Sequence, residues 1–341
     1  MNNSNCNSNS NYTNNNKTDK TSEQAEMLYN RVVKRQRHLR KWARRTGTDA
    51  YRLYDRDIPE IPVVLDIYGD AVSGALYKRP YEKDEAEEND WLAAMSDAVS
   101  KSLDIRQDRI FIKTRQKQKG ASQYNRMGKS NFWIDINEGA LKFRVNLSDY
   151  LDTGIFPDAR KKRSLLMSEA AGKSVLNLFA YTCTLSLAAA RGGASRVDSV
   201  DMSNTYLDWG EVNFALNGFS GQNGYIHNTI RSDVFPFLDR AAADRKKWDI
   251  IILDPPSFSN SKKMSGHLDI HRDYRKLIYD CLAILEKNGC IWFSTNARGF
   301  KLDQNDLRQM QIEDITEKLR DEDFKGKRIP SRWVIKKSPS S

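Results

Sequence analysis

The sequence has no long apolar run and no recognisable targeting segment. Nothing in its 341 residues approaches the roughly 18 apolar residues of a membrane-spanning helix. Residues 1–16 have neither the basic start nor the apolar centre of a secretory signal, and they lack the arginines of a transit peptide. We therefore expect a soluble cytoplasmic protein that does not bind membranes.

Cysteine is scarce, and the four cysteines (Cys6, Cys183, Cys281 and Cys290) lie far apart without a C-x-x-C pair. Because close pairs and histidines at ligand spacing are missing, the pattern argues against a disulfide framework and against a zinc site. It predicts reduced thiols, no bound metal and a reducing compartment.

The charge balance favours a polyanionic partner, since 55 Lys and Arg against 45 Asp and Glu give a net charge of +10. Leu28, Val32, Leu39 and Trp42 recur at helical spacing. No acid occurs in residues 31–45, where the basic side chains include Arg35, Arg37, Arg40 and Lys41. The pattern predicts a basic amphipathic helix in residues 25–60, and the Asn/Ser-rich residues 1–24 are expected to be a disordered tail.

Residues 61–148 are expected to form a small α+β RNA-binding domain with a mixed sheet. Residues 63–67 and 109–115 alternate as strands do, and Trp91 to Leu103 keep a helical period between them. Residues 131–136 and 140–147 predict a hairpin around Asn137-Glu138-Gly139.

From about residue 158 the predicted helices and strands alternate. The helices are expected at 158–171, 183–191, 204–216, 234–243, 271–286 and 304–320, and the strands at 174–179, 196–201, 225–230, 248–254, 290–295 and 332–337. Alternation of this kind predicts an α/β fold with a parallel, doubly wound sheet that binds its ligand at the carboxyl ends of the strands. We assign it to residues 149–341.

Acidic residues follow two of the predicted strands where such a ligand would lie. Asp201 ends the second strand and could accept hydrogen bonds from both ribose hydroxyls of an adenosine. Asp233 follows the third strand and could meet an adenine amino group. Either acid alone could instead be solvated or cap a helix. No glycine lies between Asn177 and Thr184, so the GxGxxG dinucleotide motif is excluded.

The fourth strand ends in Asp254-Pro255-Pro256-Ser257-Phe258, the most specific local pattern in the chain. The prolines fix φ and lack N–H donors, so the backbone is extended and one carboxylate faces the pocket. Phe258 could stack on an exposed base. The alternative is a rigid stop at the end of a strand. We take Asp254, Pro255, Pro256 and Phe258 as the candidate catalytic residues.

Five segments together resemble one group of S-adenosylmethionine-dependent RNA methyltransferases. They are residues 149–156 (DYLDTGIF), 177–182 (NLFAYT), 200–203 (VDMS), 254–262 (DPPSFSNSK) and 296–300 (NARGF). In order and spacing they are most similar to the RlmK/L family, in the guanine-N7 methyltransferase half of the bifunctional bacterial 23S ribosomal RNA methyltransferase. The resemblance covers roughly residues 27–337.

The resemblance implies a class I (Rossmann-like) methyltransferase domain, S-adenosylmethionine as cofactor and 23S ribosomal RNA or its large-subunit precursor as substrate. It places cofactor contacts at Tyr150, Thr153, Gly154, Phe156, Asp158 or Arg160, Asn177, Phe179, Tyr181, Thr182, Asp201, Met202, Asp233 and Asp254. Cys183 stands where the family usually has glycine. The THUMP and guanine-N2 regions that often precede this half are absent, so we expect no N2 activity, which a separate enzyme could supply.

Guanine N7 has an in-plane lone pair and no proton, so its methylation needs alignment rather than a general base. Asp254 would then accept a hydrogen bond from the N1 or N2 edge of the base. Cytosine C5 methylation needs a thiolate, and Cys281 and Cys290 fall where small buried side chains are expected. Guanine N2 and cytosine C5 remain alternative acceptors, as does a catalytically silent RNA-binding module.

Three basic clusters are expected to follow an RNA backbone. Besides the helix, these are Lys113, Arg115, Lys117 and Lys119 in one loop, and the run Arg160-Lys161-Lys162-Arg163. Lys262 and Arg298, within the family motifs, are further RNA-binding candidates. The alternative for each is a solvated face.

Overall fold

The computed structural model describes residues 9–77, 84–115, 130–219, 227–259 and 267–338. For residues 9–18, Arg115 and Gln304 it describes the backbone alone. The chain divides into two compact units, Met1–Gln118 and Lys119–Ser341. Within the described ranges, every helix is too short or too polar to cross a membrane.

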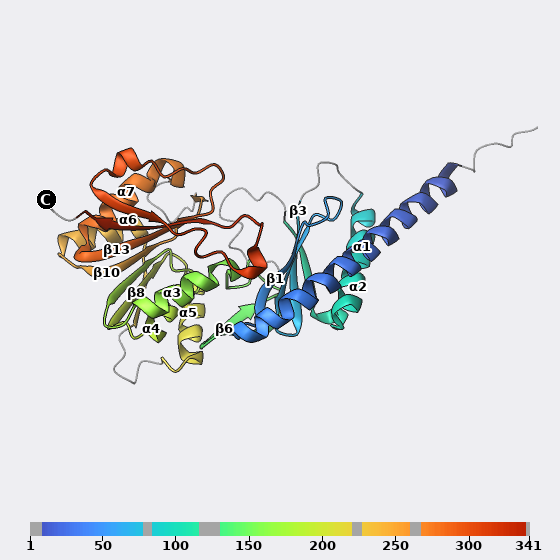
Figure 1. The fold of residues 1–341 in the computed structure, drawn as a ribbon, viewed down its shortest axis with the longest axis horizontal. Coiled ribbons are helices and arrows are strands. Elements are labelled where there is room, and N and C mark those ends of the chain that lie inside the picture. The colour runs from blue at the N-terminus through green and yellow to red at the C-terminus, as the bar shows by residue number, and fades with distance from the viewer. Residues whose placement is uncertain (1–8, 78–83, 116–129, 220–226, 260–266, 339–341) are drawn as a thin grey trace, which may run out of the picture. The chain divides into compact units, whose positions relative to one another are not determined.

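The first unit is a four-stranded sheet packed against two helices (Figure 1). The strands lie in chain order and are antiparallel except for the last, parallel pair: β1 (Ala50–Asp55), β2 (Val63–Tyr68), β3 (Ala71–Tyr77) and β4 (Ile110–Arg115). Helices α1 (Asn9–Thr46) and α2 (Glu85–Leu103) contact each other, and η1 (Gln107–Arg109) precedes β4. The predicted mixed sheet is confirmed, although β1 and β3 were not predicted.

Helix α1 buries the apolar face that its spacing predicts. Leu28, Val32 and Leu39 are fully buried. The predicted disordered tail is wrong for residues 9–24, because the helix begins at Asn9. Gln24 supplies a physical reason, since its buried side chain accepts a hydrogen bond from Trp91 Nε1 at 2.6 Å and ties this part of α1 to α2. Residues 1–8 lie outside the described residues.

The second unit is built on a seven-stranded sheet in the order β14-β15-β13-β10-β7-β8-β9. Five adjacent strands are parallel, whereas β15 runs antiparallel to both of its neighbours. The strands are β7 (Ser174–Leu178), β8 (Arg196–Asp201), β9 (His227–Arg231), β10 (Trp248–Leu253), β13 (Leu285–Thr295), β14 (Met310–Asp314) and β15 (Ser331–Lys337). The order reverses between β7 and β10, which is where such sheets bind their ligands.

Helices cover both faces of this sheet, which confirms the doubly wound α/β class. One face carries α3 (Arg160–Glu169), α4 (Thr184–Arg191) and α5 (Asn204–Leu216), and the other carries α6 (Val234–Ala243) and α7 (Ile270–Ala283) (Figure 1). Alternate residues of the central strands, such as Leu176 and Ile251, share one core with Val234 and Leu277. Asp233 and Asp269 begin α6 and α7 as N-caps.

The predicted helix at 304–320 is wrong. The structure has η4 (Gln304–Leu307), then β14 at the sheet edge, and later η5 (Glu322–Phe324). Met310 and Ile312 alternate with polar residues and pack on the core, and they pair with β15. A period of two therefore outweighs the helical propensity of the segment.

The predicted hairpin of β5 (Trp133–Glu138) and β6 (Leu141–Asn146) is confirmed, but it belongs to the second unit rather than to the small domain. Helix α5 holds it there. Trp209 Nε1 donates to the Arg144 carbonyl at 2.7 Å, and Asn213 Oδ1 accepts from the Arg144 amide at 2.9 Å. The remaining short elements are η3 (Pro157–Ala159), β11 (Phe258–Ser259) and β12 (Leu268–Asp269).

Candidate active site

The loop between β7 and α4 lies at the reversal of strand order and has an unusual backbone. Phe179, Tyr181 and Cys183 all have positive φ, at 58°, 51° and 58°. Left-handed conformations are unfavourable for residues with a Cβ and are retained mainly where the surrounding structure and function require them. The loop is therefore held in a defined shape.

Two predicted cofactor residues hold that loop in place. The Tyr181 amide donates to Asp201 Oδ2 at 2.9 Å, and Thr182 Oγ1 donates to the Gly154 carbonyl at 2.6 Å. Gly154 has φ of 96°, and a Cβ there would lie 2.2 Å from Trp209 Cζ2. Only glycine fits this position, so the segment 149–156 is fixed against the loop.

Aromatic side chains form a wall beside this junction. Phe156 is 47% exposed, and its ring centroid lies 5.5 Å from that of Tyr181, which lies 4.5 Å from that of Tyr206. Tyr150 packs at 5.5 Å from Trp209. An exposed ring beside a polar loop can contact an aromatic or sulfonium group of a ligand.

Asp201 is partly buried and accepts backbone N–H groups with both of its carboxylate oxygens, from Tyr181 and Ser203. Burial raises the pKa of Asp201, while the amides of Ser203, Tyr181 and Met202 oppose that shift. The neighbouring strand end lies close by, because the Ser232 amide donates to the Asp201 carbonyl at 3.1 Å. The structure thus brings Asp233 near Asp201.

Other predicted cofactor residues have structural partners. The Asp233 side chain caps α6 by accepting from the Phe235 amide at 3.2 Å. Asn177 is buried and donates to Ser186 Oγ, and the Thr153 side chain is buried under its own segment. Met202 and Phe179 are partly exposed at the carboxyl ends of the strands. Cofactor contacts at these positions remain predictions.

Asp254 follows β10 at the same edge of the sheet. Its side chain is 39% exposed, whereas the next residue, Pro255, is buried. Phe258 is 51% exposed at the start of the short strand β11, which pairs with β12. An accessible carboxylate and an accessible ring therefore lie within five residues, joined by two prolines.

Sequence reasoning missed the partner of Asp254. Lys162 in α3 is 2% exposed, and its Nζ lies 3.2 Å from Asp254 Oδ2 and 2.6 Å from Ser294 Oγ. A signal was present in the sequence, since Lys162 lies four and eight residues before Leu166 and Ala170, both fully buried. The basic residues on either side of Lys162 suggested an exposed cluster instead.

The basic run 160–163 is not an exposed RNA-binding cluster. Arg163 donates to both oxygens of Glu138 at 2.6 Å, and Arg160 pairs with Asp321 at 2.8 Å and Asp323 at 3.1 Å. Both arginines are buried, and Lys161 Nζ donates to a backbone carbonyl. Burial lowers the pKa of Arg160, but the carboxylates outweigh this effect and raise it. Asp158 is likewise paired, with Arg332 at 2.6 Å.

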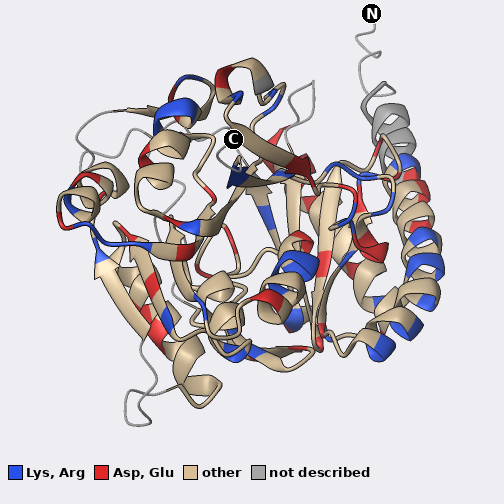
Figure 2. Cartoon of the chain, turned by 60° about the vertical axis from the view of Figure 1, so that its left-hand side comes forward, with Lys and Arg blue, Asp and Glu red and all other residues tan. Residues whose placement is uncertain are grey.

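The basic face predicted on α1 is exposed in large part. Arg37, Arg40, Lys41, Arg44 and Arg45 lie on the surface, and Figure 2 shows basic segments recurring along this helix. Arg35, in contrast, donates to the Leu53 carbonyl at 3.2 Å. Lys113 is partly exposed and Arg298 exposed. Lys117, Lys119, Lys262 and the Arg115 side chain lie outside the described residues.

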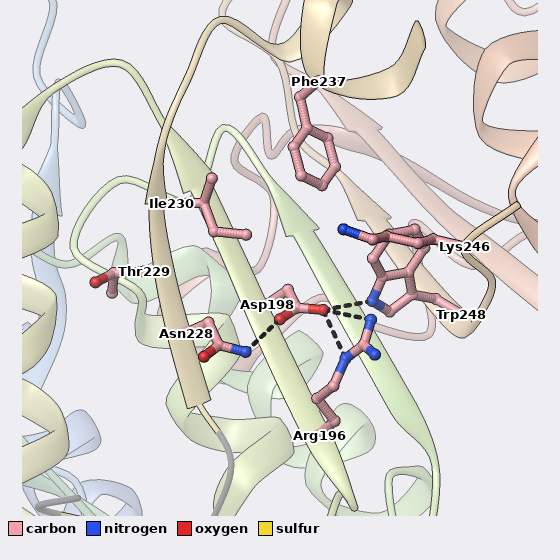
Figure 3. A pocket seen from close by; sticks show the side chains of 8 residues that line it. All are labelled: Arg196, Asp198, Asn228, Thr229, Ile230, Phe237, Lys246 and Trp248. Carbon is pink, nitrogen blue, oxygen red and sulfur yellow. Dashed lines mark hydrogen bonds and ion pairs between the residues drawn. The ribbon is translucent and has the colours of Figure 1, made fainter. Parts of the chain in front are cut away.

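A separate cavity of about 410 Å³ lies near the amino-terminal ends of β8 and β10 (Figure 3). Asp198 is its polar centre and accepts from Arg196 at 2.8 Å, Trp248 Nε1 at 2.7 Å and Asn228 at 2.7 Å. These groups satisfy one another, and they lie at the opposite end of the strands from Asp201 and Asp254. The cavity is therefore separate from the candidate active site.

A profile of the S-adenosylmethionine-dependent methyltransferases matches residues 64–305. The chain belongs to this family. Ribosomal RNA large subunit methyltransferase K of Neisseria meningitidis serogroup B is 43% identical over 307 residues, covering 90% of this chain and 86% of that protein. The K/L protein of Pseudomonas fluorescens is 42% identical over 315 residues, covering 92% of this chain. The chain spans only 41% of the length of that protein. The predicted RlmK/L resemblance is confirmed.

Solved methyltransferases share the fold. One from Streptococcus mutans has a TM-score of 0.71 at 26% identity, covering 92% of this chain and 81% of that chain. The same values hold for SMU.776, which was crystallised with SAH. A methyltransferase from Agrobacterium tumefaciens, 18% identical, has a TM-score of 0.58 and covers 86% of this chain and 91% of its own. The family profile and the neighbour crystallised with SAH together show that the cofactor of the present chain is S-adenosylmethionine, as predicted.

Proposed function

We propose that this methyltransferase transfers a methyl group to guanine N7 in 23S ribosomal RNA. The observation that carries the proposal is the carboxylate of Asp254, accessible at the sheet edge and paired with a buried ammonium, Lys162. A carboxylate in this state can accept a hydrogen bond but is a weak base. The names of the K and K/L relatives support ribosomal RNA as the substrate.

The residues present fit the cofactor. The loop fixed by Asp201 and Gly154 presents a bend beside the exposed ring of Phe156, and an acid at the end of the second strand suits a ribose. S-adenosylmethionine, when bound, supplies a methyl group on a sulfonium, whose sulfur leaves as a neutral thioether. The work left to the protein is to align the acceptor and to exclude water.

Guanine N7 suits this arrangement because it loses no proton on methylation. In the proposed complex, Asp254 accepts from the N1 or N2 edge of the guanine, and Phe258 stacks on its face. In duplex RNA N7 lies in a deep, narrow groove, so the base must be flipped or its helix opened. The exposed basic face of α1 supplies phosphate contacts for that task.

The alternative acceptors fit less well. Cytosine C5 methylation needs a thiolate, but the three described cysteines are buried. Burial raises the pKa of Cys183 to about 12 and also raises the pKa values of Cys281 and Cys290. Methylation of guanine N2 would release a proton, for which a carboxylate paired with an ammonium is a poor acceptor.

Methyl transfer from labelled S-adenosylmethionine to unmodified 23S RNA, followed by nucleoside analysis, tests the proposal. We expect 7-methylguanosine. A different methylated nucleoside would reassign the acceptor, and cofactor binding without transfer to any RNA would favour a silent RNA-binding module.

A matched pair of variants tests the role of the exposed ring. Phe258 and Tyr279 are both 51% exposed, but only Phe258 belongs to the segment 254–258 that begins with Asp254. Because base stacking contributes about 1–3 kcal/mol, Phe258→Ala should lower kcat/KM about 5-fold to 150-fold. Tyr279→Ala should leave it unchanged, and equal effects of the two substitutions would contradict the stacking role.

A further inference from the structure

Lys162 links three elements at the edge of the sheet where the ligand site lies. Strands β10 and β13 pair with Leu253 opposite Phe293, so the residues that follow, Asp254 and Ser294, lie next to each other. Lys162 Nζ reaches both from α3, at 3.2 Å from Asp254 Oδ2 and 2.6 Å from Ser294 Oγ. One oxygen of the Asp254 carboxylate thus binds Lys162, while the Asp254 side chain remains 39% exposed.

The charges around Lys162 show what the contact requires. The charged groups that face it are Asp254 directly after β10, Arg332 from β15 and Asp158 from η3. Burial is the largest effect and lowers the pKa of Lys162; Arg332 adds to this shift, and Asp254 and Asp158 oppose it only in part. A buried ammonium is unfavourable unless a carboxylate compensates it. The site therefore retains a buried amino group, bonded to Asp254 and Ser294, where an apolar side chain would be buried more easily.

We propose that Lys162 is a positioning residue that holds one carboxylate oxygen of Asp254 in place, so that the other oxygen is oriented as a hydrogen-bond acceptor for the target base. The identity of that base rests on the proposed function, but the pairing does not. A carboxylate held in this way favours acceptor atoms that carry a lone pair over groups that must lose a proton. Lys162 thereby contributes to selection of the methylated atom.

A double-mutant cycle in the 341-residue chain tests the pairing without any activity measurement. Asp254→Asn should lower the thermal midpoint by about 5 °C, because it leaves the ammonium of Lys162 without its carboxylate. In the Lys162→Met background the same change should have little effect. Equal shifts in both backgrounds would overturn the proposal. Lys161→Met is the matched control, since Lys161 binds a backbone carbonyl and should show no coupling to position 254.

Activity then separates this inference from the proposed function. Lys162→Met should lower kcat about 10-fold to 100-fold, as expected for a misplaced orienting group, with cofactor affinity unchanged. An additional Asp254→Asn change should lower it little further. If Lys162→Met leaves the rate of methyl transfer at its wild-type value, the positioning role is refuted, but the pairing with Asp254 is not. If the wild type methylates no RNA, the proposed function fails, and the stability cycle alone decides the pairing.

Discussion

Cys183 and Gly210 form a complementary pair, and the clearest prediction concerns the sign of a substitution between them. Cys183 begins α4 with φ of 58° and ψ of 26° and is fully buried. A Cβ on Gly210, in the middle of α5, would lie 2.5 Å from Cys183 Sγ and 2.9 Å from its Cβ. One side chain therefore fits between these two positions, and in this chain it is the cysteine.

Two opposing effects set the expected change in stability for Gly210→Ala. In a helix interior alanine is favoured over glycine by about 1 kcal/mol, whereas overpacking a buried contact costs about 1–3 kcal/mol. We expect a net loss of about 1 kcal/mol in the free energy of unfolding. In the Cys183→Gly background the nearest remaining heavy atom is the Thr182 carbonyl carbon at 3.5 Å, an ordinary contact. There Gly210→Ala should stabilise the protein by about 1 kcal/mol.

Urea unfolding of the cofactor-free protein, followed by tryptophan fluorescence, measures both changes, and Trp209 lies next to the substituted position. The reasoning is refuted if Gly210→Ala has the same sign in both backgrounds. Calorimetry of S-adenosylmethionine binding provides a companion measurement. We expect Cys183→Gly to change the affinity less than about 3-fold, because the thiol faces Gly210 and the loop is also held by Asp201.

Two further predictions concern the cofactor and the RNA. Burial raises the pKa of Asp201, so its ionised form should be lost at a higher pH than for an exposed aspartate. Cofactor affinity measured by calorimetry should then begin to fall with decreasing pH above the range in which an exposed aspartate titrates, and a profile identical to that of Asp201→Asn would contradict the ribose contact. Replacing the exposed Arg37, Lys41 and Arg44 by Gln should reduce the salt slope of RNA binding by about one unit per lost phosphate contact. Lys287→Gln, exposed on the other unit, is the control, and an unchanged slope in the triple variant would show that this face of α1 is only solvated.

The alternation of helices and strands could be predicted because each element carries its own period. The strand ends at Asp201 and Asp254 followed from the same pattern, since parallel strands place their carboxyl ends at one edge. The edge strand β14 could not be predicted so well, because Met310 and Ile312 give too short a pattern to outweigh charged neighbours that favour a helix. Gly154 appeared as a family motif, but its steric reason, the ring of Trp209, lies 55 residues away in the sequence.

Charge was the least reliable guide to RNA-binding residues, because the sequence does not distinguish a lysine or arginine that faces solvent from one that binds a carboxylate. The α1 and α3 segments are both rich in basic residues, yet α1 exposes most of its charges and α3 buries three of its four. The difference lies in distant partners. Glu138 in the hairpin and Asp321 and Asp323 near the C-terminus supply the carboxylates, which no local pattern reveals.

The four basic residues at the start of α3 oppose the helix dipole, which disfavours cations in a first turn. No acid occurs in that turn to offset them. The arrangement is stable because carboxylates from other elements reach the cations. Glu138, Asp321 and Asp323, which bind the arginines, are at most 9% exposed, so those pairs can only hold the structure together. Asp254, the partner of Lys162, is 39% exposed. Among these pairs it is the one that presents a carboxylate at the ligand edge, so its geometry allows contact with a substrate as well as with Lys162.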